Sequence, residues 1–142
     1  MQAALEQARL AAQRNEVPVG AVLVIGDRIV SRAGNRTIED CDPTAHAEMI
    51  ALRAAAAEVG NYRLLNALLY VTIEPCAMCA GAIIQARINR LIYGADDPKG
   101  GAVRSCFSVL EHPQLNHRVE ITPGVLMHET AALLKDFFAA RR

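Results

Sequence analysis

The spacing of apolar and polar positions along the chain predicts four helices. Residues 1–15 repeat apolar side chains every three or four positions, as an amphipathic helix does. The apolar side of this helix comprises Leu5, Ala8, Ala11 and Ala12. The other three are an Ala-rich helix from Pro43-Thr44 to about Gly60, a helix over residues 74–88 with Pro75 in its first turn, and a C-terminal helix over residues 124–142.

The segments between these helices have the composition of β-strands. "GAVLVIG" (20–26) and "RIVSRAGN" (28–35) are separated by a tight-turn signal at Gly26-Asp27, which predicts a β-hairpin. Further strands are predicted over residues 67–73, 90–95 and 118–122, and the first of these is so continuously apolar that both of its faces should be buried. Because strands alternate with helices, we predict an α/β fold, a three-layer α/β/α sandwich with helices on both sides of one sheet.

The composition narrows the class of protein. A chain of 142 residues fits a single domain with a sizeable core. No apolar run is long enough to span a bilayer, and the N-terminus lacks the features of a secretory signal. Lys and Arg number 15 and balance 15 Asp and Glu, so net charge alone does not indicate a nucleic-acid binder. Four cysteines without an export signal predict the reducing cytoplasm, where closely spaced cysteines usually bind metal or act in catalysis.

The motif "PCAMC" (75–79) is the first candidate for chemistry. Its spacing places Cys76 and Cys79 on one face of a helix's first turn, where the helix N-terminus favours the thiolates that zinc requires. His46 lies at the start of the preceding helix, and two helix starts that each follow a strand of one sheet can point at a common spot. His46, Cys76 and Cys79 therefore predict a zinc site. Structural zinc sites use four protein ligands, so three ligands predict a catalytic zinc with a position for water.

Glu48 stands two positions after His46, and side chains two apart on a helix point in different directions. We therefore interpret Glu48 as a base beside the metal and not as a further ligand. Zinc lowers the pKa of bound water to about 7, and a neighbouring carboxylate can take the proton and pass it to a substrate nitrogen. This combination predicts hydrolytic attack on a carbon that bears an amino group.

The motifs "HAE" and "PCAMC" match the pattern H-x-E…P-C-x-x-C, so the chain resembles the cytidine-deaminase-like zinc deaminases. Longer stretches, including "NEVPVGAVLV", "GNRTIEDCDPTAHAEMIALR" and "LLKDFF", resemble bacterial tRNA-specific adenosine deaminases along nearly the whole chain. The resemblance implies one deaminase domain over residues 1–142, a central mixed five-stranded sheet, one Zn²⁺ per chain and a homodimer. It also implies that the wobble adenosine in the anticodon stem-loop of an arginine tRNA is converted to inosine.

The resemblance also implies roles for residues outside the metal motif. Asn35 matches the asparagine that hydrogen-bonds the flipped-out nucleoside, and Asp97 matches a position near the flanking nucleotide. Phe137 and Phe138 match residues of the C-terminal helix near the RNA. The segment that walls the base pocket is matched by Val17, Pro18, Val19, Gly20 and Ala21. Without the resemblance, Asn35 and Asp97 would be interpreted as turn residues. Phe137 and Phe138 would be interpreted as part of the apolar side of a helix, but both cannot face the core equally, so we expect one of them to be free to stack on RNA.

Other functions stay open at this point. Deaminases of a free base or nucleoside, such as guanine or cytidine, share the zinc motif, although "KDFFAARR" favours the tRNA enzyme because Arg141 and Arg142 suit phosphate contacts. A zinc-stabilised RNA-binding module without activity would need a fourth protein ligand and would have no use for Glu48. Cys41 and Cys106 are interpreted as buried or free thiols. Compared with the family, the chain starts late and stops without a basic tail, so we expect a shorter first helix.

Overall fold

The computed structural model describes residues 1–141, and Arg142, the predicted phosphate contact, lies outside the described residues. The elements follow in the order α1 (Gln2–Gln13), β1 (Gly20–Ile25), β2 (Arg28–Gly34), α2 (Ala47–Val59), β3 (Ala67–Ile73), α3 (Ala77–Gln85), β4 (Arg90–Ala95), β5 (Glu120–Thr122) and α4 (Met127–Ala139). Every element that the sequence predicts is therefore present. Three helices begin later than predicted: α2 starts at Ala47 and not at Pro43-Thr44, α3 starts only after an extended segment at Cys76, and α4 only after a left-handed residue, Leu126.

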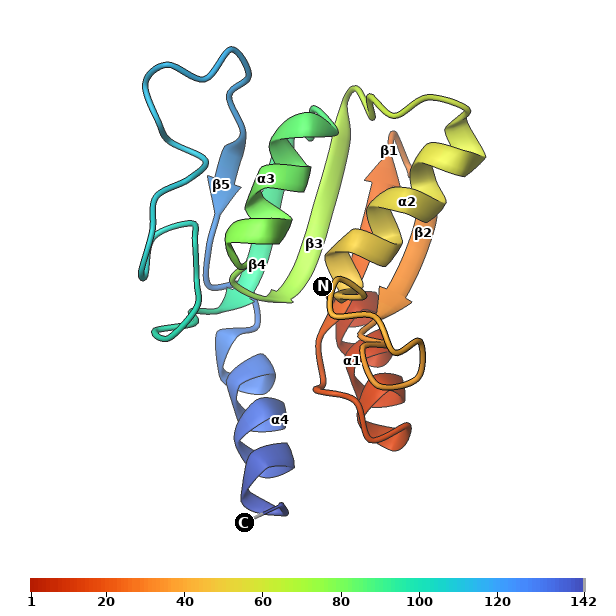
Figure 1. Ribbon diagram of the computed structural model, residues 1–142, viewed down its shortest axis with the longest axis vertical. Helices are drawn as coiled ribbons and strands as arrows, with labels where there is room; N and C mark the ends of the chain where they lie inside the picture. Colours follow the sequence, from red (N-terminus) through yellow and green to blue (C-terminus); the bar gives the residue numbers. More distant parts are fainter. Residues whose placement is uncertain (142) are drawn as a thin grey trace.

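The strands form one five-stranded sheet with the order β2-β1-β3-β4-β5 (Figure 1). Strand β1 pairs antiparallel with both β2 and β3, whereas β3, β4 and β5 run parallel to one another. The predicted β-hairpin and mixed sheet are thus confirmed. Because β3 and β4 are parallel, their carboxyl ends meet at one edge of the sheet, and the segments after Ile73 and Ala95 leave side by side.

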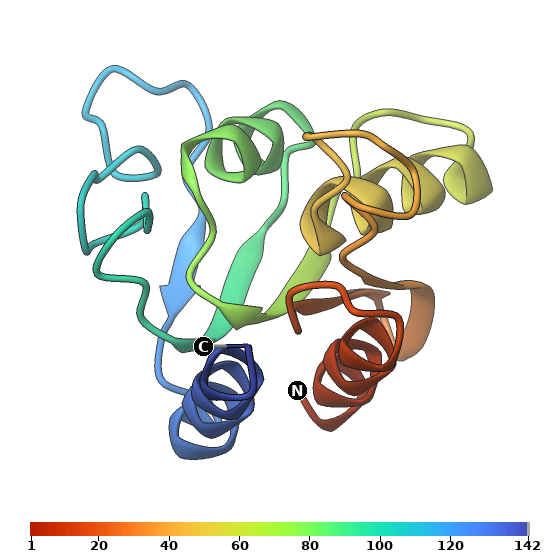
Figure 2. The ribbon, with the colours of Figure 1, turned by 60° about the horizontal axis from the view of Figure 1, so that its bottom comes forward.

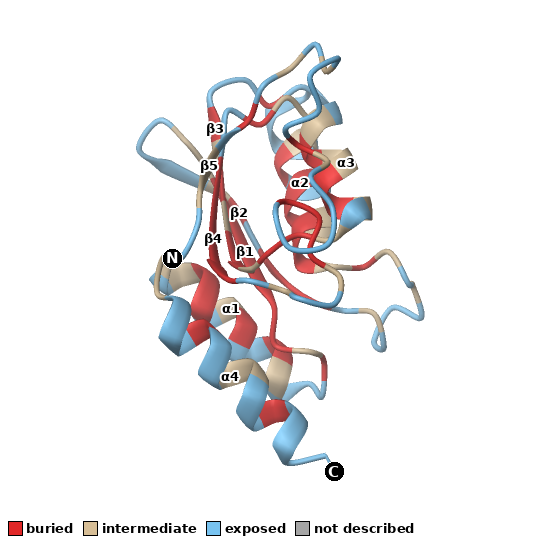
Figure 3. Ribbon diagram, turned by 90° about the vertical axis from the view of Figure 1, so that its left-hand side faces the viewer, coloured by how far each residue is buried: buried red, intermediate tan, exposed pale blue. Residues whose placement is uncertain are grey.

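Helices cover both faces of the sheet. Helices α2 and α3 lie on one face, and α1 and α4 lie beside each other on the other (Figures 2 and 3). The three-layer α/β/α sandwich is therefore confirmed, with buried residues on the central strands and on parts of the helices that cover them (Figure 3). None of the helices within residues 1–141 has the length and apolar character needed to cross a membrane.

Burial along α1 differs in detail from the prediction, whereas burial along β3 agrees with it. Helix α1 buries Ala4 together with Leu5, Ala8 and Ala11, whereas Ala12 is only half-buried because it lies at the border of the apolar side. Strand β3 alternates between buried and half-buried positions and exposes none of its residues. The sheet is therefore covered on both faces at β3, as the continuous apolar run predicts.

Two glycines allow the helices to approach the sheet closely. A Cβ atom on Gly20 would overlap the backbone of α1 at Ala4, and a Cβ atom on Gly94 would lie 2.5 Å from the Thr130 hydroxyl oxygen of α4. Any larger residue at either position would push a helix away from the sheet. The close contact between β4 and α4 keeps the C-terminal helix beside the edge where β3 and β4 end, which is also where the predicted metal ligands lie.

Candidate metal and active site

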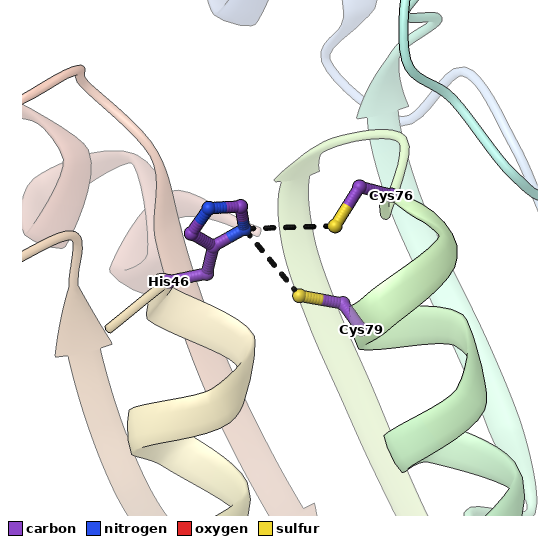
Figure 4. Close-up of side chains that lie close together, drawn as sticks. All are labelled: His46, Cys76 and Cys79. Atoms are coloured by element: carbon purple, nitrogen blue, oxygen red, sulfur yellow. Dashed lines mark hydrogen bonds between the residues drawn. The ribbon is translucent and has the colours of Figure 1, made fainter. Parts of the chain in front are cut away.

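The three predicted metal ligands converge from two helix starts. His46 is the residue before α2 and Cys76 the residue before α3, and both have extended backbones with ψ of 151° and 175°. Cys79 belongs to the first turn of α3 and is fully buried. Figure 4 shows the imidazole ring and both sulfur atoms pointing toward one another. The neighbouring positions of α2 and α3 on the same face of the sheet therefore bring the two motifs together.

The distances in this cluster fit a zinc ion. Nδ1 of His46 lies 3.6 Å from Sγ of Cys76 and 3.6 Å from Sγ of Cys79. Zn–N bonds of about 2.0 Å and Zn–S bonds of about 2.3 Å at a tetrahedral angle would separate nitrogen and sulfur by about 3.5 Å, close to these distances. Within residues 1–141, no fourth His, Cys, Asp or Glu joins this group of ligand atoms. The cluster can thus supply three corners of a tetrahedron.

The proton affinities of these groups also favour a bound cation. Hydrogen bonds from Cys79 and His46 lower the pKa of Cys76 to about 3, so this sulfur is a thiolate. The hydrogen bond to Cys76, together with burial, raises the pKa of Cys79, because a second thiolate would lie against the first. The hydrogen bond to Cys76 likewise raises the pKa of His46. A divalent cation would stabilise both thiolates and bind the neutral imidazole, so metal binding would release protons.

Glu48 lies beside this cluster in the first turn of α2 and is only 3% exposed. Its Oε2 atom has no hydrogen-bond partner among the described residues. Burial raises the pKa of Glu48 to about 7, although the backbone and His46 act in the opposite direction. A carboxyl group with a pKa near 7 can both accept and release a proton at neutral pH.

A pocket of about 720 Å³ opens onto the cluster. His46, Glu48 and Cys76 line it together with five of the other predicted site residues: Val17, Val19, Asn35, Asp97 and Phe138. The remaining five predicted residues, Pro18, Gly20, Ala21, Cys79 and Phe137, are buried and do not line the pocket. The prediction that one of the two phenylalanines faces the core holds, since Phe137 is 9% exposed and Phe138 is 49% exposed.

Asn35 and Asp97 each lie just after a strand, and both line the pocket. Oδ1 of Asn35 accepts the backbone N–H of Ala47 at 2.8 Å, at the start of α2, which leaves the side-chain NH₂ group for a ligand. Oδ1 of Asp97 accepts the backbone N–H groups of Lys99 and Gly100 at 3.0 and 3.1 Å. The turn interpretation is therefore confirmed for Asp97, whereas Asn35 forms no local turn and bonds to the start of α2.

Several pocket residues were not predicted from the sequence as part of this site. These are Thr37, Ile73, Glu74, Lys99 and Leu134. Two of them left a local signal, since Glu74 directly precedes "PCAMC" and Leu134 is one helical turn before Phe138. Arg141 also lines the pocket, but its guanidinium lies 3.5 Å from the centre of the Phe137 ring and donates to Oδ1 of Asn15 at 3.1 Å.

Comparison with known proteins places this fold and site in a class. The family model described as MafB19-like deaminase matches residues 1–142, which agrees with a deaminase of the cytidine-deaminase-like fold. The chain is 50% identical to the tRNA-specific adenosine deaminase of Agrobacterium fabrum, over 100% of this chain and 93% of that one. It is 52% identical to that of Haemophilus influenzae, over 100% of this chain and 83% of that one.

A solved structure from work on A-to-I editing by tRNA:A34 deaminases at the wobble position of transfer RNA is also similar. Its identity to this chain is 51% and its TM-score is 0.91, over 94% of this chain and 97% of that one. The chain therefore belongs to the tRNA-specific adenosine deaminase family.

Proposed function

We propose that this protein converts adenosine to inosine at the wobble position of a tRNA anticodon, that of an arginine tRNA. The observation that carries the proposal is the pocket of about 720 Å³, which joins a His-Cys-Cys group and a buried glutamate to a rim of polar and aromatic side chains. Relatives with this activity in their names share about half of the sequence. We further propose one catalytic domain over residues 1–142, located in the cytoplasm, in keeping with its free cysteines.

We propose that His46, Cys76 and Cys79 hold one Zn²⁺ per chain. When bound there, the ion would supply a nucleophile at neutral pH by lowering the pKa of water to about 7. Glu48 would take up one proton from the attacking water and deliver it to the amino nitrogen on C6 of adenine. As the oxygen of the water bonds to C6, the C6–N bond would break and ammonia would leave, while the second proton of the water stays on the base. The low exposure of Glu48 keeps this proton transfer inside the pocket.

The walls of the pocket suit a purine nucleoside. The side-chain NH₂ group of Asn35 is not used by α2 and is positioned to donate a hydrogen bond to the base. Val17 and Val19 provide apolar contact. The buried residues Pro18, Gly20 and Ala21 act behind this wall, where they hold the two valines in place.

The rim of the pocket suits RNA. Phe138 is half-exposed and offers a ring face on which a flanking base can stack. Oδ2 of Asp97 makes neither of the turn hydrogen bonds and can accept one from a ribose 2′-OH, the group that distinguishes RNA from DNA. Lys99 and Arg141 bring positive charge to the same rim. With no net charge overall, the protein is suited to a small footprint such as a hairpin loop.

We expect adenosine at the wobble position of an anticodon stem-loop to be deaminated much faster than matched DNA, free adenosine, cytidine or guanine. Only a polynucleotide can make the contacts at the rim. A hairpin loop also presents its base already unpaired, which avoids most of the cost of flipping a base out of a duplex, a few kcal/mol. Inosine formation on each substrate measures this preference. Faster turnover of a free base or nucleoside would instead support the alternative, a zinc-dependent deaminase of small substrates.

The same assay tests Asp97. In Asp97→Asn the preference for RNA over DNA should fall by about two- to tenfold, the effect of one lost hydrogen bond, while the chemistry persists. Asp96→Asn is the matched control, because Asp96 is its exposed neighbour and does not line this pocket. If Asp97→Asn prefers RNA over DNA as strongly as the wild type does, Asp97 does not bind the ribose 2′-OH.

We also propose a homodimer. Helix α3 has the sequence AMCAGAIIQ, in which Gln85 is the only side chain that carries a polar amide or charge. A helix that is apolar all round is normally buried all round, yet α3 leaves half-exposed residues on its outer side, among them Met78, Gly81 and Ala82. A second copy of the chain would cover this surface.

Light scattering should therefore give twice the mass of the chain. Gly81→Arg should shift the protein toward the monomer, because a Cβ atom on Gly81 meets nothing within 4 Å in its own chain and the fold can accommodate the change. Ala131→Arg, at an exposed position of α4 on the opposite face of the sheet, is the control and should stay dimeric. A wild-type enzyme that is a monomer at full activity would contradict this proposal.

A further inference from the structure

Glu74 is a buried carboxylate for which the proposed chemistry has no use. It follows β3 and is 1% exposed. Oε1 accepts the backbone N–H groups of Val103, Arg104 and Ser105 at 3.0, 2.7 and 2.9 Å. Oε2 accepts the backbone N–H of Asp97 at 3.0 Å and the hydroxyl of Ser105. A single side chain thus binds both ends of the loop of residues 96–105.

The loop encloses this carboxylate as it would a bound anion. Both oxygens of the buried carboxylate accept hydrogen bonds from the loop, three on Oε1 and two on Oε2. Hydrogen bonds to an ionised carboxylate are roughly twice as strong as those between neutral groups. A Cβ atom on Gly101 would overlap the carboxylate, so the loop can close around Glu74 only because residue 101 is glycine.

The same loop is joined to the segment that carries a metal ligand. Gly101 forms an isolated antiparallel bridge with Cys76. The backbone N–H of Ala102 donates to the carbonyl of Pro75 at 2.8 Å. The loop also carries Asp97 and Lys99 to the rim of the pocket. Glu74 therefore lies where the metal-binding segment and the rim meet, without being a metal ligand itself.

We propose that Glu74 is a positioning residue for RNA recognition, whose carboxylate fixes the loop of residues 96–105 and thereby sets where Asp97 and Lys99 meet the nucleotides that flank the target. This inference rests on the proposed function. Without the carboxylate the loop loses five hydrogen bonds. The free energy needed to order the loop again when RNA binds would weaken the affinity for RNA. Loss of the carboxylate should therefore change mainly KM and have much less effect on kcat.

Glu74→Gln tests this inference, because glutamine keeps the size of the side chain but turns an NH₂ group toward backbone N–H donors. We expect KM for the stem-loop to rise roughly tenfold or more, while kcat and the zinc content of the purified protein change less than about threefold. Glu120→Gln is the matched control. It removes a carboxylate that pairs with Arg90 at 2.6 Å, at the opposite end of β4, and should leave both kinetic constants unchanged.

A double-mutant cycle separates positioning from a merely structural effect. If Glu74 acts through Asp97, the rise in KM in a Glu74→Gln, Asp97→Ala double variant should be clearly smaller than the product of the two single effects. Should Glu74→Gln fail to fold, Ser105→Ala removes one donor only and should raise KM by a few fold. Hydrogen exchange is an independent readout, in which the amides of residues 97–105 should lose protection while those of β1 and β3 keep it.

The outcomes distinguish the two proposals. A wild-type enzyme that is inactive on the stem-loop would reject the proposed function itself. If the wild type is active, three results each overturn the inference about Glu74: an unchanged KM in the zinc-loaded variants, effects that multiply fully with Asp97→Ala, or loss of zinc from Glu74→Gln. A higher KM with retained zinc, non-multiplicative effects and local loss of protection would establish it.

Discussion

Replacing Glu48 by alanine is expected to abolish deamination while zinc binding and RNA binding persist. The side chain is 3% exposed, lies outside the group of ligand atoms, and has an oxygen without a hydrogen-bond partner among the described residues. Burial raises its pKa to about 7, the range in which it can take up a proton and release it again. General acid–base catalysis contributes roughly 10²–10⁴-fold, and the proposed mechanism uses Glu48 for both proton transfers, so we expect a loss at or above the upper limit.

Three measurements check this expectation: the single-turnover rate of inosine formation, the zinc content, and the affinity for the stem-loop. Glu58→Ala is a suitable control, since Glu58 belongs to the same helix but is exposed and pairs with Arg28 at 3.3 Å. Its rate should stay close to that of the wild type. A near-normal rate in Glu48→Ala would exclude Glu48 from the proton transfers, and loss of zinc would make it a ligand instead.

Cys76→Ser is expected to lose zinc and, with it, all measurable activity. A serine hydroxyl stays protonated at neutral pH and is a poor substitute for a thiolate ligand, which leaves only His46 and Cys79 to hold the ion. The variant should also be less stable, because a zinc ion that bridges the starts of α2 and α3 in the folded state alone would favour folding by mass action. We expect about one zinc per wild-type chain and almost none in the variant.

Cys41→Ser is the matched control for this experiment. Cys41 is exposed, lies in the loop between β2 and α2, and does not belong to the metal group. The variant should keep its zinc, its activity and its melting temperature, and a chelator should lower the melting temperature of the wild type and of Cys41→Ser alike. If Cys41→Ser also lost zinc, the site would have four protein ligands, and a zinc-stabilised RNA-binding module would become the better hypothesis.

The local patterns of the sequence determined the elements and the chemical type of the site. Apolar spacing is a property of neighbouring residues, so the helices and strands could be predicted to within a few positions. The position of each motif near a helix start is equally local: the sequence predicts His46 and Cys76 in the first turns of two helices, and in the structure each is the residue just before its helix. The convergence of the two motifs followed from the general geometry of an α/β sheet, and the distances of 3.6 Å agree with it.

Only the tertiary structure decided which side chains face the pocket. "VPVGA" contributes just Val17 and Val19, because Pro18 and the start of β1 are buried beneath them. Phe138 reaches the rim while Phe137 is buried, since the contact between α4 and β4 sets the rotation of the helix. Glu74 precedes a recognisable motif, but its partners are 23 to 31 residues away. Such contacts depend on the order of strands in the sheet and on how the loops close. They bring together residues that are far apart in the sequence, so the pattern of neighbouring residues does not reveal them.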